Sequence, residues 1–230
     1  MDTTPRKPGR PRDPDLESRR KAQILETAAK VFAGFGFAGT QVQVIADRLG
    51  VGNGTVYRYF PTKEALFLAA VERGLEELTA EMDRVLDQPV DDPVVQTRQA
   101  IRAYLGFFHR RPEMAELFIQ ERATFPHHHR PLYFANKAED ERSCRHAAFW
   151  SGLVASGKVR DLAPERFFAV VGDLLYGTIL TNLLSGRPVD PDAQTEDVLD
   201  VIMNGVLTDP ERSRQRTGQP DEPETREEGR

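Results

Sequence analysis

The segment from Thr55 to Phe60 combines hydroxyl, aromatic and guanidinium side chains. It reads TVYRYF, and Val56 and Phe60 lie four residues apart, so both can pack inward from one face of a helix. The side chains left largely outward are polar or aromatic: Thr55, Tyr57, Arg58 and Tyr59. Hydroxyl and guanidinium groups hydrogen-bond to phosphates and base edges. A protein core would not favour these residues, so the helix is expected to face another molecule.

The residues before this segment predict another helix and a tight turn. Between Thr40 and Leu49 the apolar residues recur at the three-and-four spacing of one helical face, and Thr40 is placed as the N-cap. Gly50 ends that helix, and the stretch to Gly54 supplies turn chemistry because glycine adopts left-handed backbone angles freely. Two helices joined in this way are typical of a helix-turn-helix, whose second helix enters the major groove of DNA.

Two further helices are expected on either side of this motif. The first spans about Leu16 to Gly34 and carries an apolar stripe. The members of the stripe are Ile24, Leu25, Ala28, Ala29 and Phe32. Thr62 is the expected N-cap of a longer helix that reaches Leu86. The N-terminal module is therefore predicted to be three helices followed by a long fourth helix.

The charge of the chain is unevenly distributed. The net charge is −5, but residues 1–63 hold 11 Lys and Arg against 6 Asp and Glu, whereas the remainder holds 20 against 30. Because salt screens charges separated by more than about 8 Å, the local charge decides which partner binds. The basic N-terminal module is therefore compatible with a polyanionic partner despite the acidic remainder.

The pattern after Val94 stays helical, and no alternating strand pattern is found, so we expect an all-α fold. The expected parts are a flexible basic arm over residues 1–15, a helix-turn-helix domain over 16–75, a helical C-terminal domain over 76–208 and a disordered tail over 209–230. The functional linker between the two domains is placed on or just before the proline-bearing break at 87–93.

The last two predicted helices, Phe167 to Leu184 and Thr195 to Leu207, are expected to form a homodimer contact. The first is apolar over most of its circumference, so it needs two neighbours. Gly172, Gly177 and Gly205 would let helices approach closely. Together the two helices have the pattern of half a four-helix bundle shared between subunits. The alternative is an ordinary helix pair buried inside a monomer.

Several classes of function find no support in the sequence. No stretch approaches the roughly 18–20 consecutive apolar residues that span a bilayer, and no signal-peptide core follows the basic start, so a cytoplasmic protein without a membrane partner is expected. Cys144 is the only cysteine, expected to be a buried thiol with a redox sensor as the alternative. His127, His128 and His129 favour a polar loop over a metal site, because no second ligand cluster accompanies them. Without a phosphate loop or a nucleophile elbow, we expect neither an enzyme nor a cofactor.

The run from Phe37 to Phe67 resembles the DNA-binding domain of the tetracycline-repressor (TetR) family of bacterial transcription regulators. It reads FAGTQVQVIADRLGVGNGTVYRYFPTKEALF and matches the family's Thr, Ile-Ala, Gly-Val, Gly-Thr, Tyr-x-Phe and Lys-Glu-Ala-Leu pattern. The likeness extends over Leu16 to Leu75. It implies a homodimeric, ligand-responsive regulator, most often a repressor, that binds a palindromic operator in double-stranded DNA and carries a helical ligand-binding and dimerisation domain. The alternative is a DNA-organising or partner-recruiting protein of the same fold with no small-molecule effector.

The resemblance also implies which residues touch DNA. The implied contacts are Thr40 and Lys63 with phosphates, Tyr57 and Tyr59 with phosphates and base edges, and Thr55 and Arg58 in the recognition helix. Many members have Ser-Lys where this chain has Gly52 and Asn53, so a cap hydroxyl and a cationic contact are expected to be missing. Asn53 is a candidate to pair with adenine instead. We expect Arg58 to set specificity by bonding guanine through two donors, with a phosphate-bound or solvated arginine as the alternative.

A second DNA-reading element is expected in the N-terminal arm. Pro5 to Arg12 reads PRKPGRPR and looks like an AT-hook, a minor-groove peptide centred on Gly9, Arg10 and Pro11. Proline keeps the chain extended, and Arg10 favours the negative potential of a narrow A·T-rich groove. Pro8 replaces an arginine that is common in the hook. The alternative is a basic tail that adds only nonspecific attraction.

Aromatic residues of the C-terminal domain predict a cavity between helices for a small apolar or aromatic effector. The candidate lining residues are Tyr104, Phe108, Phe118, Phe149, Trp150 and Tyr176. For each of them taken singly, packing in the core is the alternative. Only their grouping in space can decide between a lining and a core role.

Overall fold

The computed structural model describes residues 14–88, 93–125, 151–152, 154, 163–186 and 190–204. Within these ranges every regular element is an α-helix and there is no strand, which confirms the predicted all-α fold. Several positions named above lie outside the described residues: Arg10 and the AT-hook, His127 to His129, Cys144, Phe149, Trp150 and the tail from 209 to 230.

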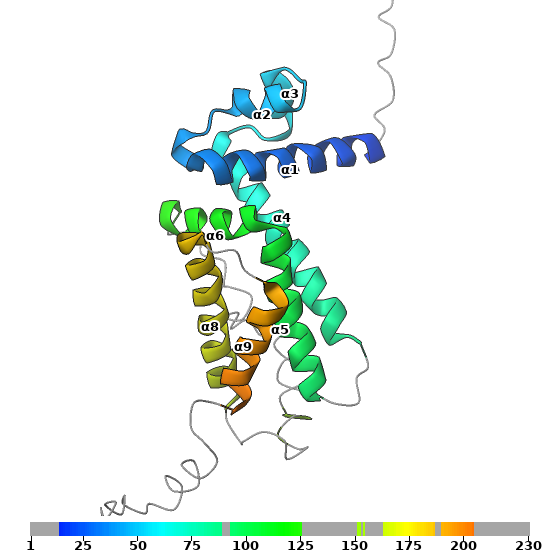
Figure 1. The fold of residues 1–230 in the computed structure, drawn as a ribbon. Coiled ribbons are helices and arrows are strands. Elements are labelled where there is room, and N and C mark those ends of the chain that lie inside the picture. The colour runs from blue at the N-terminus through cyan, green and yellow to red at the C-terminus, as the bar shows by residue number, and fades with distance from the viewer. Residues whose placement is uncertain are drawn as a thin grey trace, which may run out of the picture.

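Three helices form one end of the molecule: α1 (Pro14–Gly39), α2 (Val42–Arg48) and α3 (Asn53–Tyr59) (Figure 1). The apolar stripe predicted for α1 is buried. Side chains with no exposed surface lie between the helices: Ile24, Ala28 and Phe32 from α1, Ile45 from α2 and Val56 from α3. Burying side chains of this size stabilises a fold by roughly 1.5–3 kcal/mol each. Their inward direction leaves the polar faces of α2 and α3 outside.

The ends of α1 and α3 differ from the prediction. α1 begins at Pro14, inside the expected arm, and continues past Gly34 through a bend at Gly36. Only Gly36 leaves the helical conformation, and the residues after it form a further helical turn that ends at Gly39. α3 begins at Asn53, two residues before the predicted Thr55, because the extended residue before it serves as the N-cap.

The turn between α2 and α3 depends on Gly50. Its φ of +64° lies in the left-handed region that favours glycine, as predicted. The N–H of Val51 donates to the Ala46 carbonyl at 3.0 Å and closes the turn. The two helices are therefore held in a fixed relation by backbone geometry.

Helix α4 (Lys63–Leu86) connects the two parts of the molecule. Thr62 caps it as predicted, since its Oγ1 accepts a hydrogen bond from the Ala65 N–H at 3.0 Å. The helix crosses residue 75, the expected end of the DNA-binding domain, without a break and ends at Leu86 as predicted. In Figure 1 it descends from the first three helices to lie beside α5 (Pro93–Arg110). Helix α4 therefore joins the end of the helix-turn-helix directly to the second part of the molecule.

Helix α6 (Pro112–Thr124) lies below α1 and runs in nearly the same direction across the view (Figure 1), and it packs closely against α4. The close approach occurs at Gly74 of α4, where an added Cβ would overlap the Met114 sulfur and touch the Phe118 ring. Glycine is therefore required here for space, and α4 and α6 pack as one unit.

Helices α8 (Pro164–Ser185) and α9 (Pro191–Asn204) complete the second part. Five of their apolar side chains are buried: Val171, Leu175 and Ile179 from α8, and Val198 and Leu199 from α9. Helix α9 begins at Pro191, four residues before the predicted Thr195, because Pro191 is compatible with a first helical position. The predicted residues after Asn204 lie outside the described ranges.

Apolar side chains also remain exposed on this helix pair. The exposed fractions are 62% for Val170, 36% for Leu174, 77% for Leu184 and 50% for Val201. By length and composition alone, residues 165–185 could cross a membrane, with a mean hydropathy of 1.6 and only 17% of the window buried. No spanning stretch was expected from the sequence, because Asp173 interrupts the run of consecutive apolar residues. One charged residue lowers the mean hydropathy of the window only slightly. One helix of this kind is weak support for a membrane span, since an uncovered helix of a subunit contact has the same composition.

Candidate nucleic-acid interface

The outer face of α3 presents aromatic and cationic side chains. Tyr57 is 41% exposed and Arg58 is exposed, while the two residues predicted to pack inward are buried. Thr55 and Tyr59 are half-buried, so they are less outward than predicted. The Arg58 guanidinium lies 5.1 Å from the Tyr59 ring centroid, a cation–π distance. This stacking holds the guanidinium beside the aromatic residues that the resemblance assigns to DNA.

The N-terminus of α3 has no side-chain cap. Gly52 is the N-cap residue, with extended backbone angles and no side-chain hydrogen bond to the helix. The Oδ1 of Asn53 is buried and has no hydrogen-bond partner among the described residues. Pairing with adenine uses both amide atoms, so the Asn53 side chain would have to rotate outward to read a base.

A tight turn at the end of α1 positions α2. Gly36 has φ +71° and ψ 163°, a conformation that L side chains rarely adopt. Thr40 is buried, and its N–H and Oγ1 both donate to the Gly36 carbonyl, at 3.1 and 2.7 Å. The predicted cap role of Thr40 is therefore wrong: its hydroxyl finds an acceptor in the preceding turn, and the N-cap of α2 is Gln41, without a side-chain cap bond.

The first residue of α4, Lys63, reaches back to the same turn. Its Nζ donates to the carbonyls of Phe37 at 2.8 Å, Ala38 at 3.3 Å and Thr40 at 3.2 Å. The ammonium also lies 4.7 Å from the centroid of the Phe37 ring. Cations stabilise the carbonyl end of a helix, and α1 has no basic residue in its own last turn. Lys63 supplies that cation from another helix.

Aromatic rings and one amide join this turn to α6. The Phe37 ring packs edge-on against Phe67 of α4 and Phe125 beyond the end of α6, with centroids 5.2 and 5.0 Å apart. The Gln120 side chain of α6 accepts a hydrogen bond from the Phe37 N–H at 3.0 Å and donates to the Phe32 carbonyl at 3.2 Å. The end of α1 is thus held by residues of both parts of the molecule.

A second polar junction surrounds Arg111, between α5 and α6. Its guanidinium pairs with Glu26 of α1 at 3.0 Å, Glu77 of α4 at 2.6 Å and Glu113 of α6 at 2.6 Å. Burial works to lower the pKa of Arg111, but the Glu113 hydrogen bond and the neighbouring carboxylates raise it above its ordinary value. Burial works to raise the pKa of Glu26, but the Lys30 hydrogen bond and the Arg111 charge lower it below its ordinary value. No pattern in the sequence indicated this junction, because its partners are far apart in the chain.

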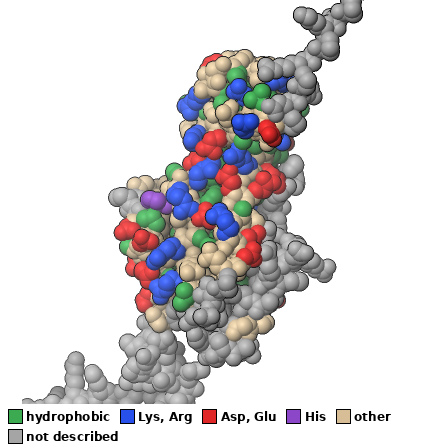
Figure 2. Space-filling view, turned by 90° about the vertical axis from the view of Figure 1, so that its right-hand side faces the viewer, with side chains coloured by type: hydrophobic (Ala, Val, Ile, Leu, Met, Phe, Trp, Pro, Cys, Tyr) green, Lys and Arg blue, Asp and Glu red, His purple; other side chains and the backbone are tan. Residues whose placement is uncertain are grey.

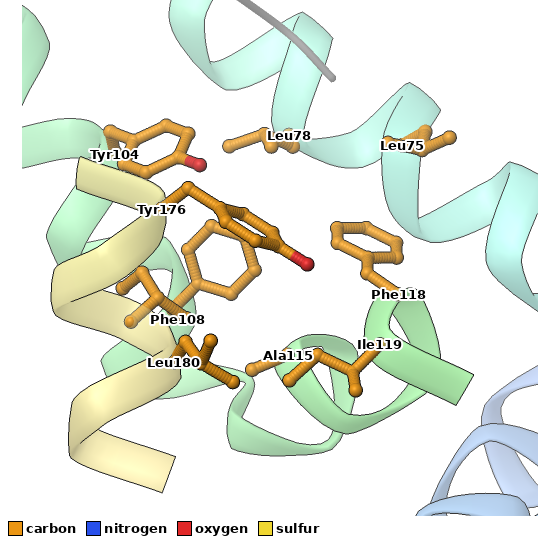
Figure 3. Close-up of a pocket in the computed structure, with 10 residues that line it drawn as sticks. Leu75, Leu78, Tyr104, Phe108, Ala115, Phe118, Ile119, Tyr176 and Leu180 are labelled. Atoms are coloured by element: carbon orange, nitrogen blue, oxygen red, sulfur yellow. The ribbon is translucent and has the colours of Figure 1, made fainter. Parts of the chain in front are cut away.

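A small apolar cavity lies between α4, α5, α6 and α8 (Figure 3). It is lined by four of the six predicted residues, Tyr104, Phe108, Phe118 and Tyr176, and also by Leu75, Leu78, Ala115, Ile119, Ile179 and Leu180. Figure 3 shows the Tyr176 hydroxyl pointing toward Phe118. Only about 20 Å³ is available to the centre of a water molecule, room for about one water, whereas ligand pockets measure about 300–1,000 Å³.

Two features of the cavity wall bear on what it can hold. Burial, together with the nearby Tyr176, raises the pKa of the Tyr104 phenol above its ordinary value, so the hydroxyl stays protonated. Leu75 and Leu78 belong to α4, the helix that begins at Lys63 beside α3. The wall is thus apolar apart from tyrosine hydroxyls, and one side of it continues into the DNA-binding part.

The described surface has mixed charge. On the face drawn in Figure 2, Lys and Arg side chains are interspersed with Asp and Glu. Among the described residues no group of three or more His, Cys, Asp or Glu side chains could hold a metal ion.

The helix-turn-helix lies inside a region with a known counterpart. Residues 24–70, which include α2, α3 and the turns on either side, match the family model described as "Bacterial regulatory proteins, tetR family". Through these residues the chain has a DNA-binding domain of the TetR family. A protein with this domain is a transcriptional regulator, and its DNA-binding element is the helix-turn-helix described above.

Curated relatives agree with that assignment. The HTH-type transcriptional regulator RutR of Escherichia coli O157:H7 is 28% identical over 156 residues, covering 67% of this chain and 71% of RutR. The HTH-type transcriptional activator FasR of Mycolicibacterium smegmatis is 27% identical over 193 residues, covering 81% and 83% of the two chains. The HTH-type transcriptional repressor KstR of the same species is 33% identical over 70 residues, covering 30% and 34%.

Solved structures share the fold of this chain. The regulator PfmR from Thermus thermophilus superimposes with a TM-score of 0.63 at 21% identity, covering 80% of this chain and 99% of that one. FadR from Bacillus subtilis, solved in complex with stearoyl-CoA, gives a TM-score of 0.62 at 17% identity, covering 81% and 99%. At these identities the likeness concerns the fold alone.

Proposed function

We propose that this protein is a ligand-responsive transcriptional repressor that binds a palindromic operator as a homodimer and works in the cytoplasm. The observation that carries the DNA-binding part is the outer face of α3, where Tyr57 and Arg58 are exposed above a closed core. Such side chains on the second helix of a helix-turn-helix contact phosphates and base edges. KstR is named as a repressor, which supports repression. FasR is named as an activator, so an experiment must distinguish repression from activation.

The proposed DNA contacts centre on α3. Arg58 is the residue we assign to base specificity, with Tyr57 and Tyr59 on phosphates and base edges. Further proposed contacts are Thr55, the α3 N-terminus at Gly52 and Asn53, and Arg10 in the N-terminal arm. Thr40 and Lys63 have their polar groups engaged inside the protein, at distances of 2.7 to 3.3 Å. A contact with phosphate would require either residue to exchange partners.

The homodimer is proposed to form through α8 and α9. Val170, Leu184 and Val201 are at least half exposed in the single chain. Covering apolar surface is favourable by roughly 25 cal/mol per Å², so a second copy packed on this face would stabilise both. A two-fold dimer presents two α3 helices to DNA, which dictates a palindromic operator with half-site centres about 34 Å apart or slightly more.

The effector is proposed to be a small apolar or aromatic molecule in the cavity next to Tyr104 and Tyr176. The apolar wall supports this class, and the Tyr176 hydroxyl could bond one polar group of the ligand. Because the cavity has room for only about one water, a ligand must push its walls apart. One wall is α4, so the ligand-bound form would place the two α3 helices at another separation and bind DNA poorly.

The alternative is a DNA-organising or partner-recruiting protein of the same fold with no small-molecule effector. The small volume of the cavity favours it. A thermal-shift screen of apolar and aromatic compounds separates the two, because a ligand that binds only the folded state raises the melting temperature. No shift with any compound, in a protein that binds its operator, would support the alternative.

Footprinting the purified protein on DNA that flanks its own gene tests the operator. Within that site, Arg58→Ala is expected to cost about 1–3 kcal/mol of binding free energy, but only at the base pair that Arg58 reads. The measurement is binding to a panel of single-base operator variants. An equal loss on every variant would assign Arg58 to a phosphate instead, and absence of any footprint would remove the proposed function.

A further inference from the structure

The ammonium group of Lys63 has no donor left for another partner. A lysine ammonium carries three N–H bonds and accepts none. Three carbonyl oxygens surround it, those of Phe37, Ala38 and Thr40, at 2.8, 3.3 and 3.2 Å. The face of the Phe37 ring lies 4.7 Å away and adds a cation–π contact. A phosphate could be reached only by giving up at least one of these acceptors.

Two of the three carbonyls, those of Phe37 and Ala38, belong to the last turn of α1, and that of Thr40 belongs to the connection between α1 and α2. Thr40 lies two residues before α2, and its N–H and hydroxyl are already bonded to Gly36. The Lys63 bond to the Thr40 carbonyl ties this same residue to the first residue of α4. The chain that enters the helix-turn-helix is therefore held on one side by α1 and on the other by α4.

We propose that Lys63 is a positioning residue that holds the end of α1 and thereby orients the helix-turn-helix, rather than a phosphate contact. The inference rests on the proposed DNA-binding function. Exposed cations elsewhere in the module, such as Arg48 and Arg58, are available for phosphates. Lys63 acts through the orientation of α2 and α3, so its loss weakens every DNA complex alike.

The test compares Lys63→Met with the wild type in two measurements. Methionine keeps much of the aliphatic stem and removes the ammonium. We expect the melting temperature of the DNA-free variant to fall by several degrees, since a partly buried set of hydrogen bonds is lost. Affinity is expected to fall about tenfold on the operator and on unrelated duplex alike, with an unchanged slope of log K against log salt. Arg48→Met, which removes an exposed cation, is the control and is expected to leave that melting temperature unchanged.

A phosphate contact predicts the opposite pattern. Its loss would lower the salt slope by about 0.9 and leave the melting temperature of the DNA-free protein in place. Either result overturns the positioning role.

A measurement on the wild type covers the case in which Lys63→Met does not fold. An ammonium held by three acceptors exchanges its protons slowly, so the DNA-free, ¹⁵N-lysine-labelled protein should show a persistent Nζ–H signal assigned to Lys63. If the Lys63 ammonium exchanged its protons as fast as the exposed lysines do and gave no such signal, the proposal would be overturned. If the wild type binds no duplex at all, the proposed function fails, while this signal and the melting temperature still report separately on the contact with the end of α1.

Discussion

The helix-turn-helix end and the α8–α9 pair treat their apolar residues in opposite ways. In α2 and α3 the apolar side chains are buried or half-buried, and the large exposed side chains are polar, cationic or aromatic with a hydroxyl, as for Arg58 and Tyr57. In α8 and α9 large apolar side chains such as Val170 and Leu184 remain exposed at 62% and 77%. A surface of the first kind suits a hydrated polyanion, and one of the second kind suits an apolar partner. One chain thus carries two unlike surfaces at its two ends.

The largest effect is expected from a charged substitution on the exposed apolar surface of α8. Val170→Glu puts a charge into the proposed subunit contact, where it has no partner, and should yield monomers. Because a monomer offers only one α3 helix, operator affinity should fall by about 100-fold or more, measured together with the sedimentation mass. Ala80→Glu, which adds the same charge at an exposed position of α4, is the control. A dimer that survives Val170→Glu would move the contact elsewhere.

An intermediate effect is expected at the junction between the two ends. Arg111→Met leaves Glu26, Glu77 and Glu113 without their shared cation, and should lower the free energy of unfolding by about 2 kcal/mol. The measurement is chemical denaturation. Arg110→Met, which removes a more exposed cation paired with Glu81, should cost less than half as much.

The junction should also show a pH dependence of defined sign. The pKa of folded Glu26 is lowered from its ordinary value near 4.5, because the Lys30 hydrogen bond and the Arg111 charge outweigh the effect of burial. Its contribution to stability is therefore complete above that value and is lost as the pH falls below it. The difference between wild type and Arg111→Met should shrink on acidification through this range. A difference that stays constant would mean that Arg111 acts through packing alone.

The smallest effect is expected at the turn that positions α2. Gly36→Ala forces a Cβ onto a backbone with φ +71°, at a cost of about 1–2 kcal/mol in unfolding free energy. Gly39→Ala is the matched control, because Gly39 has neither a positive φ nor atoms close to an added Cβ. If both variants unfolded alike, the turn would tolerate other backbone angles and could not define the orientation of α2.

Local signals in the sequence were enough for much of the fold. Gly50 ends α2 with a positive φ, Thr62 caps α4, and α4 ends at Leu86, all as predicted. Four of the six aromatic residues predicted to line a cavity meet in one, although aromatic residues of a helical domain could also have packed apart. These features depend on backbone preference and on helical spacing, which are properties of neighbouring residues.

The sequence by itself determined the helices, their apolar faces and the helix-turn-helix motif, because each depends on residues within a few positions of one another. Tertiary structure alone decided the partners of Lys63 and Arg111. Each of these polar groups bonds to whichever acceptor the packed helices bring within about 3 Å, and for Arg111 and Glu26 that acceptor lies 85 residues away in the chain. Spacing along a helix cannot foresee such a contact, since it exists only after α1, α4 and α6 have met.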